Sequence, residues 1–217
     1  MTNLTNNNPN LQLNEDFWTI KNVPYRSGMY NVDLLKKLLD NRRYKTQSQW
    51  IEYSKQAKEN NGFYVGDSTL YHSLFTSLYK LKNKPETEKI RNFLQKSFKH
   101  GPMTLTRIVI PVSGLDEIIH NIGMPNRYSI KKNLCEYVKD SKNPLCYGIF
   151  LGTENLQEID FVYKWITGKN AFLWKDNSKL YKHSEKIAWF SSDNERTNLT
   201  FDGGLSSKNS ALGIRVF

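Results

Sequence analysis

Cysteine is scarce in this chain, with only Cys135 and Cys146 among 217 residues. Two cysteines exclude a disulfide-rich scaffold and leave room for one bridge at most. Long apolar runs are absent too, since nothing approaches the roughly 18 consecutive apolar residues of a membrane-spanning helix. The opening MTNLTNNNPN has neither the basic start nor the apolar centre of a signal peptide, and we expect residues 1–16 to form a disordered tail. These absences predict a cytoplasmic protein, while display at the cell surface by another route stays open.

Motifs for metal and phosphate chemistry are also missing. The four histidines form no H-E-x-x-H pattern and no C-x-x-C pair occurs, so a zinc site has no support. The FDGG stretch at residues 201–204 is not followed by the Lys-Ser or Lys-Thr of a phosphate loop. The acidic residues Asp193, Glu195 and Asp202 lack the spacing of a calcium-binding loop. We therefore expect neither a metal ion nor a cofactor.

A hydrolytic triad could be read into Ser113, Asp116 and His120, which lie close together in the sequence. Triads normally assemble from distant segments, so this local spacing is weak support for catalysis. A buried, hydrogen-bonded structural role for His120 is the favoured interpretation, and we expect a noncatalytic protein.

Apolar residues make up 38% of the chain, and tryptophan, tyrosine and phenylalanine together contribute 28 side chains, enough for a packed core. The first half has apolar residues at helical spacing, bounded by capping residues and by glycine or proline. This pattern predicts a helical region over residues 17–102. Its expected helices cover residues 31–43, 46–62, 66–83 and 84–101.

The second half, residues 103–217, is richer in short β-branched and aromatic runs, which are typical of strands. One strong helical pattern interrupts it at residues 153–168, with Thr153 as the expected cap and Gly168 as the stop. Helices first and strands last predict an α+β fold with C-terminal antiparallel strands. The expected strands cover residues 103–112, 116–122, 133–139, 147–152, 170–174, 186–190, 197–201 and 212–217.

The net charge is +10, and residues 31–100 hold 14 Lys or Arg against 7 Asp or Glu. One interpretation is a nucleic-acid-binding module that uses the helical half, where Lys80, Lys82 and Lys84 end a helix that carries aromatic residues. The other interpretation is a solvated, lysine-rich surface. The lysines are spread along the segment rather than clustered, which favours the second interpretation.

The most unusual segment is SSDNERTNLTFDGGLSSKNS, residues 191–210. Fourteen of these twenty residues are Ser, Asn, Asp, Gly or Thr, yet apolar runs stand on both sides. Leu199 and Phe201 are two apart and would face one side of a strand, while Asn198, Thr200 and Asp202 would face solvent. The final LGIRVF can pair back into the sheet and lock the loop in place. This pattern favours a surface held out for contact over a loose tail.

The same ending carries a resemblance to a known family. An apolar AWF run, a Ser/Asn/Asp/Gly-rich stretch and then NSALGIRVF resemble the variable region of proteins that diversity-generating retroelements diversify, in particular archaeal variable proteins with a C-type lectin fold. YKWITGKNAFLW and FLQKSFKHGPMTLTRIVIPVSGLDEIIHNIG are similar to that group as well. The resemblance extends from about Ser68 to Phe217 and is strongest after Gly148.

The resemblance implies a C-type lectin-like fold, related to that of formylglycine-generating enzymes, with a variable segment at about residues 187–217. In that family a reverse transcriptase copies a template RNA with errors at adenines, and the copy replaces the 3′ end of the gene. The implied function is noncatalytic binding of a ligand, which we expect to be a protein; neither sugar nor calcium binding follows. An enzyme on the related fold would need paired catalytic cysteines, and Cys135 and Cys146 lie outside the C-terminal strands.

Residue type and alternation then assign two sets of positions. We expect a scaffold of Trp189, Phe190, Leu199, Leu212, Gly213, Arg215 and Val216. We expect Arg196, Phe201 and Lys208 to be the larger contacts of the binding surface. The variable, ligand-binding positions would be Ser191, Ser192, Asp193, Arg196, Asn198, Thr200, Asp202, Gly203, Gly204, Ser206, Ser207 and Ser210.

Overall fold

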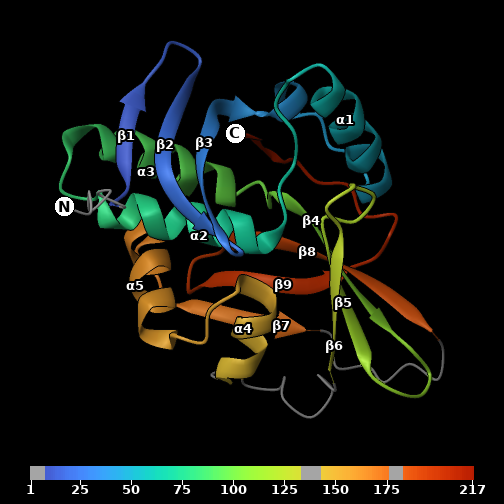
Figure 1. Cartoon of the computed structure of the whole chain (residues 1–217). Helices are drawn as coiled ribbons and strands as arrows, with labels where there is room; N and C mark the ends of the chain where they lie inside the picture. The colour runs from blue at the N-terminus through green and yellow to red at the C-terminus, as the bar shows by residue number, and fades with distance from the viewer. Residues whose placement is uncertain (1–7, 133–142, 176–182) are drawn as a thin grey trace, which may run out of the picture.

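The computed structural model describes residues 8–132, 143–175 and 183–217 and has a mixed α+β architecture. A four-stranded sheet has the order β1-β2-β3-β10, and a six-stranded sheet has the order β6-β5-β4-β8-β9-β7 (Figure 1). The strands of the first sheet are β1 (Asn10–Leu13), β2 (Phe17–Tyr25), β3 (Gly28–Leu38) and β10 (Leu212–Val216). Those of the second are β4 (Met103–Ile110), β5 (Asp116–His120), β6 (Tyr128–Lys132), β7 (Ala171–Lys175), β8 (Ser184–Ser192) and β9 (Thr197–Gly203).

Helices fill the space between and beside the sheets. Figure 1 shows α2 and α3 between the four-stranded sheet above and the six-stranded sheet below. The five α-helices of the described chain are α1 (Gln47–Glu59), α2 (Ser68–Lys80), α3 (Pro85–Phe98), α4 (Pro144–Leu151) and α5 (Leu156–Thr167), with a short 3-10 helix at Leu39–Arg42. None of these helices is long and apolar enough to cross a membrane.

Aromatic side chains join these layers into one core. Phe75 of α2 lies 5.6 Å from both Phe98 of α3 and Phe190 of β8, measured between ring centroids. Tyr163 of α5 completes the cluster, 6.1 Å from Phe190. All four side chains are fully buried, so α2, α3, α5 and the six-stranded sheet share one apolar interior.

The last strand returns to the first sheet. β10 pairs antiparallel with β3, where Val216 lies opposite Val32. The backbone groups of Asn31 and Phe217 exchange two hydrogen bonds of 2.9 and 3.0 Å. Arg215 of β10 donates from Nη2 to Asp33 Oδ2 at 2.7 Å. The C-terminal segment thus forms a paired strand as expected, but its partner is β3 of the first sheet and not a strand of the six-stranded sheet.

Most expected elements of the chain are confirmed: α1, α2, α3 and α5, and the strands β4, β5, β7, β8, β9 and β10 all lie where the sequence pattern places them. The cap of α5 is Asn155 rather than Thr153, because the Asn155 side chain accepts from the Glu158 amide at 3.1 Å. Residues 10–13 of the expected tail form β1. The strand expected at residues 133–139 lies outside the described residues.

The helix expected over residues 31–43 is wrong, because this segment belongs to β3 and the 3-10 helix that follows it. The four residues from Val32 to Leu35 are all buried, so both faces of β3 are covered at this point, and β3 also has β2 and β10 as neighbours in the sheet. A strand buried on both faces has a nearly continuous apolar run, which imitates helical spacing. The helical region expected at residues 17–102 therefore starts later, at α1.

The strand expected at residues 147–152 is wrong as well, because these residues belong to α4 and its C-cap. Asn143 caps the helix by accepting from the Leu145 amide, Pro144 occupies the first turn, and Gly152 ends it at φ 80°. These terminal signals decide the structure of a short apolar run that periodicity alone leaves ambiguous.

The C-terminal strands are not all antiparallel, which corrects a further expectation. β7 pairs in parallel with β9, with Leu173 beside Leu199. β8 lies on the other side of β9 and runs antiparallel to it. β10 leaves this sheet altogether. β7 and β8 are therefore not neighbours in the sheet. β9 lies between them, although it follows both in the sequence.

Candidate binding surface

The polar segment 191–210 is built into the fold. It comprises the end of β8, a turn, the whole of β9 and a loop that leads to β10. Across the hairpin, Ser192 pairs with Thr197 and Ser191 with Asn198. The segment is therefore a structured surface, as the alternation of its residues predicts.

The turn between β8 and β9 is organised by Asp193. Its Oδ1 accepts from the amides of Glu195 and Arg196 at 2.8 and 2.9 Å, and its Oδ2 accepts from the Asn198 side chain at 2.8 Å. These donors favour the ionised carboxylate and lower the pKa of Asp193 to about 2. The Lys169 ammonium also donates to the Asp193 carbonyl oxygen. Asp193 is exposed, and its hydrogen bonds also fix the shape of the turn.

Arg196 is exposed at the same turn and is the largest side chain available there. Its guanidinium carbon lies 4.5 Å from the ring centroid of Phe172, and its Nε lies 4.0 Å from Asp193 Oδ2. The ring below and the carboxylate beside it orient the guanidinium while leaving its outer edge open to solvent. The predicted role of Arg196 as a large surface contact is compatible with this position.

The inner face of β9 anchors the hairpin. Leu199 and Phe201 are buried, and the Phe201 ring lies 3.9 Å from that of Phe150 between centroids. The burial of Phe201 corrects its expected role as a contact residue, because its ring faces the α4 side of the core.

Two residues on or at the end of β9 are not displayed, contrary to expectation. Thr200 is only 5% exposed, because it pairs directly with the bulky Trp189 on the same outer face of the hairpin. Gly203 is buried under the Trp189 ring, and a Cβ atom there would lie 2.3 Å from Trp189 Cζ3. Alternation gives the side of the strand correctly for Thr200, whereas an irregularity at Asp202 brings Gly203 to the side of Trp189, and the tryptophan covers both positions.

The loop after β9 is fixed to the other half of the fold. Asn209 and Lys45 exchange backbone hydrogen bonds of 3.0 and 3.1 Å, and the Trp50 indole donates to the Asn209 carbonyl at 2.9 Å. The Ser210 hydroxyl donates to the His100 carbonyl at 3.1 Å, and Ser210 is fully buried. Ser210 is therefore an anchor, which corrects its assignment to the displayed set.

The remaining expected positions form two separate groups. We call Ser191, Ser192, Asp193, Arg196 and Asn198 the tip patch. We call Asp202, Gly204, Ser206, Ser207 and Lys208 the loop patch. All ten are exposed or half-buried, but the patches lie at opposite ends of β9. Their nearest members along the strand, Asn198 and Asp202, are four residues and about 13 Å apart.

The expected scaffold residues hold this surface in different ways. Gly213 allows a close approach, since a Cβ atom there would lie 2.7 Å from Leu39 Cδ2. Arg215 pairs with the buried Asp33. Trp189 and Val216 are half-buried. The fully buried members are Phe190, Leu199 and Leu212.

His120 has the structural role that the sequence favours. It is fully buried, with Nδ1 3.2 Å from Thr106 Oγ1 and Nε2 3.0 Å from the Ile149 carbonyl oxygen. A carbonyl can only accept, so Nε2 donates and Nδ1 accepts from the threonine hydroxyl, which is the neutral tautomer. Burial lowers the pKa of His120 accordingly. Within the ranges that the structure describes, no three His, Cys, Asp or Glu side chains gather at a possible metal site.

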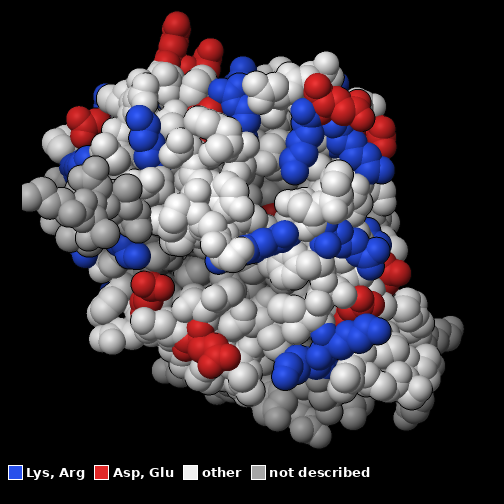
Figure 2. Space-filling model, viewed as in Figure 1, with Lys and Arg blue, Asp and Glu red and all other residues white. Residues whose placement is uncertain are grey.

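The basic residues do not form one stripe on the face shown in Figure 2, where lysine and arginine side chains are spread out with acidic ones among them. Cys146 is buried, whereas Cys135 lies outside the described residues. No known protein family, curated protein sequence or solved structure matches the chain.

Proposed function

We propose that this chain is a noncatalytic ligand-binding protein that presents the tip and loop patches on a C-type lectin-like scaffold, with those patches diversified by a retroelement. One observation carries the proposal. Along residues 190–212, buried anchors alternate with exposed polar side chains, so the backbone is fixed where the surface is free to change. Exposed substitutions of this kind usually alter stability by less than about 0.5 kcal/mol.

The burial pattern narrows the set of variable positions. Thr200, Gly203 and Ser210 are assigned to the framework because each is buried against a specific neighbour. The other expected variable positions remain in the tip and loop patches. The framework also keeps β9 rigid, so binding would cost little ordering entropy.

The separation of the patches favours a macromolecular ligand. By strand alternation, Ser191, Asn198 and Asp202 lie on one face of the hairpin, so both patches border that face. A ligand that contacts both patches must extend at least about 13 Å along β9, and a standard protein interface, which covers about 800 Å² on each partner, does so. A protein ligand is therefore the partner that this surface fits best.

Sequencing the DNA around the gene tests the proposal directly. We expect an adjacent reverse-transcriptase gene and a near-copy of the codons for residues 187–217, with mismatches chiefly at template adenines. The mismatches should fall on codons of the tip and loop patches and spare those of Thr200, Gly203 and Ser210. Absence of both the reverse transcriptase and the near-copy would contradict the proposal, as would mismatches centred on the buried anchors.

The nucleic-acid alternative has its own measurement. Binding of a single-stranded RNA and of a duplex DNA would be measured as salt is raised. A steep fall in the binding constant would indicate several phosphate contacts and favour a nucleic-acid-binding module. We expect weak binding with a shallow dependence, since acidic side chains interrupt the basic ones on the face in Figure 2.

A further inference from the structure

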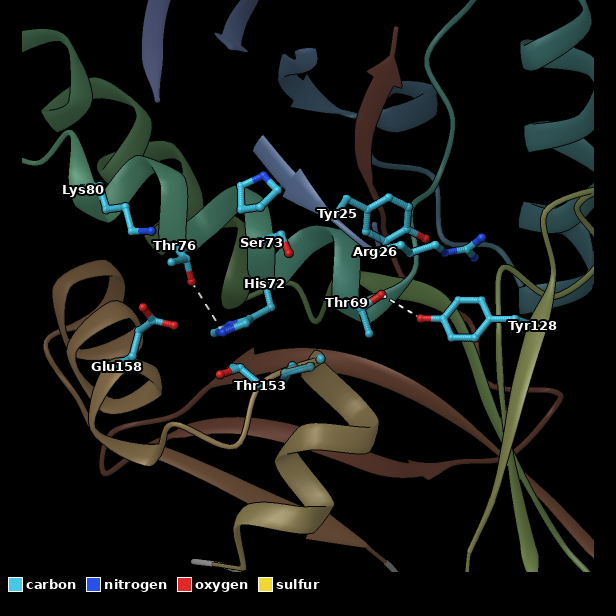
Figure 3. A pocket seen from close by; sticks show the side chains of 13 residues that line it. Tyr25, Arg26, Thr69, His72, Ser73, Thr76, Lys80, Tyr128, Thr153 and Glu158 are labelled. Atoms are coloured by element: carbon cyan, nitrogen blue, oxygen red, sulfur yellow. Dashed lines mark hydrogen bonds between the residues drawn. The ribbon is translucent and has the colours of Figure 1, made fainter. Parts of the chain in front are cut away.

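A pocket lies away from both patches, where α2 faces the β2–β3 turn, the start of β6 and the segment from α4 to α5. This pocket has a volume of about 310 Å³. Figure 3 shows its labelled side chains converging from these four parts of the chain. Its size suits a small molecule rather than a macromolecule.

The α2 wall of the pocket is a polar stripe. Thr69, Ser73, Thr76 and Lys80 follow one another at helical spacing and all line the pocket. Most of the remaining residues of α2 are buried. A helix in the interior of a domain is usually apolar all round, so a polar stripe facing a pocket calls for a polar occupant.

One end of the pocket is held rigid by its own contacts. The Tyr128 hydroxyl lies 3.1 Å from Thr69 Oγ1, and the Arg26 guanidinium carbon lies 4.1 Å from the Tyr128 ring centroid. Arg26 also donates to the Asn126 carbonyl at 2.7 Å. The Tyr25 hydroxyl donates to the buried Asp67 at 2.6 Å. These groups are already engaged, so they shape the wall more than they offer free donors.

The middle of the pocket is uncharged. Burial lowers the pKa of His72 to about 3, so the imidazole facing the pocket is neutral near pH 7. Its Nε2 lies 3.5 Å from Thr76 Oγ1, at the long limit of a hydrogen bond. The Ser73 hydroxyl makes no hydrogen bond with the described part of the chain. Ser73 and Thr76 therefore keep capacity for a ligand.

The other end carries two opposite charges that are not used within the fold. Lys80 on α2 and Glu158 on α5 lie toward the same end of the pocket in Figure 3. Neither the Lys80 ammonium nor the Glu158 carboxylate forms an ion pair or a hydrogen bond with any residue that the structure describes, and they do not pair with each other. A molecule that carries an ammonium and a carboxylate group on one carbon atom could satisfy both at once.

We propose that this pocket binds a small zwitterion of the α-amino acid class. Its ammonium group pairs with Glu158 and its carboxylate with Lys80, because these two charges are separated by a single carbon atom in an α-amino acid. The ligand side chain extends past Ser73 and Thr76 toward the Tyr128 end. This site is independent of the tip and loop patches and does not rest on their proposed function.

Isothermal titration calorimetry with the full chain tests the site. The standard L-amino acids are titrated singly to about 10 mM, a range that detects dissociation constants near 1 mM. The best binder is then compared with its N-acetyl derivative and its methyl ester, which each lack one charge. We expect both derivatives to bind at least roughly tenfold more weakly, as for a lost charge-assisted hydrogen bond.

Charge-neutral variants supply the structural half of the test. Glu158→Gln and Lys80→Met should each weaken binding of the best amino acid by roughly tenfold. The matched controls Glu59→Gln and Lys89→Met change exposed charges outside the pocket and should leave binding unchanged. Lys80 is exposed and Glu158 half-buried, so both variants should keep the wild-type melting temperature.

Two results would overturn the proposal. One is the absence of binding by every amino acid in the panel. The other is binding of acetate or inorganic phosphate as tight as that of any amino acid, weakened by Lys80→Met but unaffected by Glu158→Gln. That second pattern would assign the pocket to simple anions, with no role for the carboxylate.

Discussion

Single residues of the 191–210 segment have opposite roles although their composition is uniform. Gly203 and Gly204 are adjacent, yet a Cβ atom at Gly203 would collide with the Trp189 ring, whereas Gly204 has nothing within 4 Å of that position. Ser206 is exposed, whereas Ser210 is fully buried. Small polar residues therefore serve here either as surface or as spacers that let a large neighbour pack, and residue type alone does not separate the two.

The paired glycines give a prediction at this scale. Gly203→Ala should lower the free energy of unfolding by about 1–3 kcal/mol, as overpacked sites do, because the Trp189 ring must move. Gly204→Ala should change it by less than about 0.5 kcal/mol. Urea unfolding followed by tryptophan fluorescence measures both. Equal effects of the two substitutions would show that the ring does not rest on Gly203.

Asp193 gives a second prediction, which concerns pH. Its pKa is lowered to about 2 by the backbone donors of the turn. A lowered carboxyl pKa means that the stabilisation is present above the unfolded value near 3.8 and is lost as pH falls through about 2. The amide NMR signals of Glu195 and Arg196 should therefore stay constant down to about pH 3 and shift below it. A shift centred near pH 4, or an unchanged low-pH transition in Asp193→Asn, would contradict the assignment.

Two arginines supply a third prediction, because one was expected in the scaffold and the other in the variable set. Arg215 pairs with Asp33, which is only 1% exposed and also accepts from the Thr19 hydroxyl at 2.6 Å. Arg215→Ala leaves that carboxylate buried and poorly compensated, so it should cost about 3–5 kcal/mol of unfolding free energy. Arg196→Ala removes only an exposed 4.0 Å contact with Asp193 and an exposed contact with the Phe172 ring, and it should cost about 1 kcal/mol. Chemical denaturation of both variants is the measurement, and similar losses would refute the distinction.

An element with one buried face could be predicted from the sequence. A strand buried on both faces and a very short buried helix could not. The apolar stripe of α3 has a clear helical period, and Pro85 in its first turn agrees with it. The pattern of β3 resembles that of a helix because its central residues are buried on both faces, and α4 shows no clear period because it has only eight residues. The apolar pattern of a segment depends on which of its faces are buried. The pattern therefore predicts the wrong secondary structure where distant strands or helices bury an additional face.

The candidate sites show the same limit. Alternation along β9 correctly places Leu199 inside, but Thr200 is covered by a tryptophan on another strand. The pocket beside α2 has walls from four segments of the chain, so no single stretch of sequence reveals it. Its one local signal is the polar stripe of Thr69, Ser73, Thr76 and Lys80 on a helix that is otherwise mostly buried.

For the whole molecule, two buried histidines predict acid sensitivity. Burial lowers the pKa of both His72 and His120. Folding therefore keeps them neutral, so the stability is complete above the unfolded value of 6.5 and declines as pH falls below it. Each histidine should contribute up to about 1.4 kcal/mol per pH unit to this decline.

Urea midpoints measured between pH 7.5 and pH 5 check this expectation. His72→Gln should flatten the pH dependence, since glutamine does not titrate, whatever its effect on absolute stability. An unchanged slope in His72→Gln would show that this histidine does not titrate on unfolding.

The pairing of β3 with β10 joins residues that are about 180 positions apart in the chain, as the Asp33–Arg215 pair shows. Contacts of such long range close the largest loops and tend to form late in folding. Substitutions in β10 should then act mainly on the unfolding rate and little on the folding rate. The strand that fixes the far end of the displayed segment would thus control how long the native state persists once it has formed.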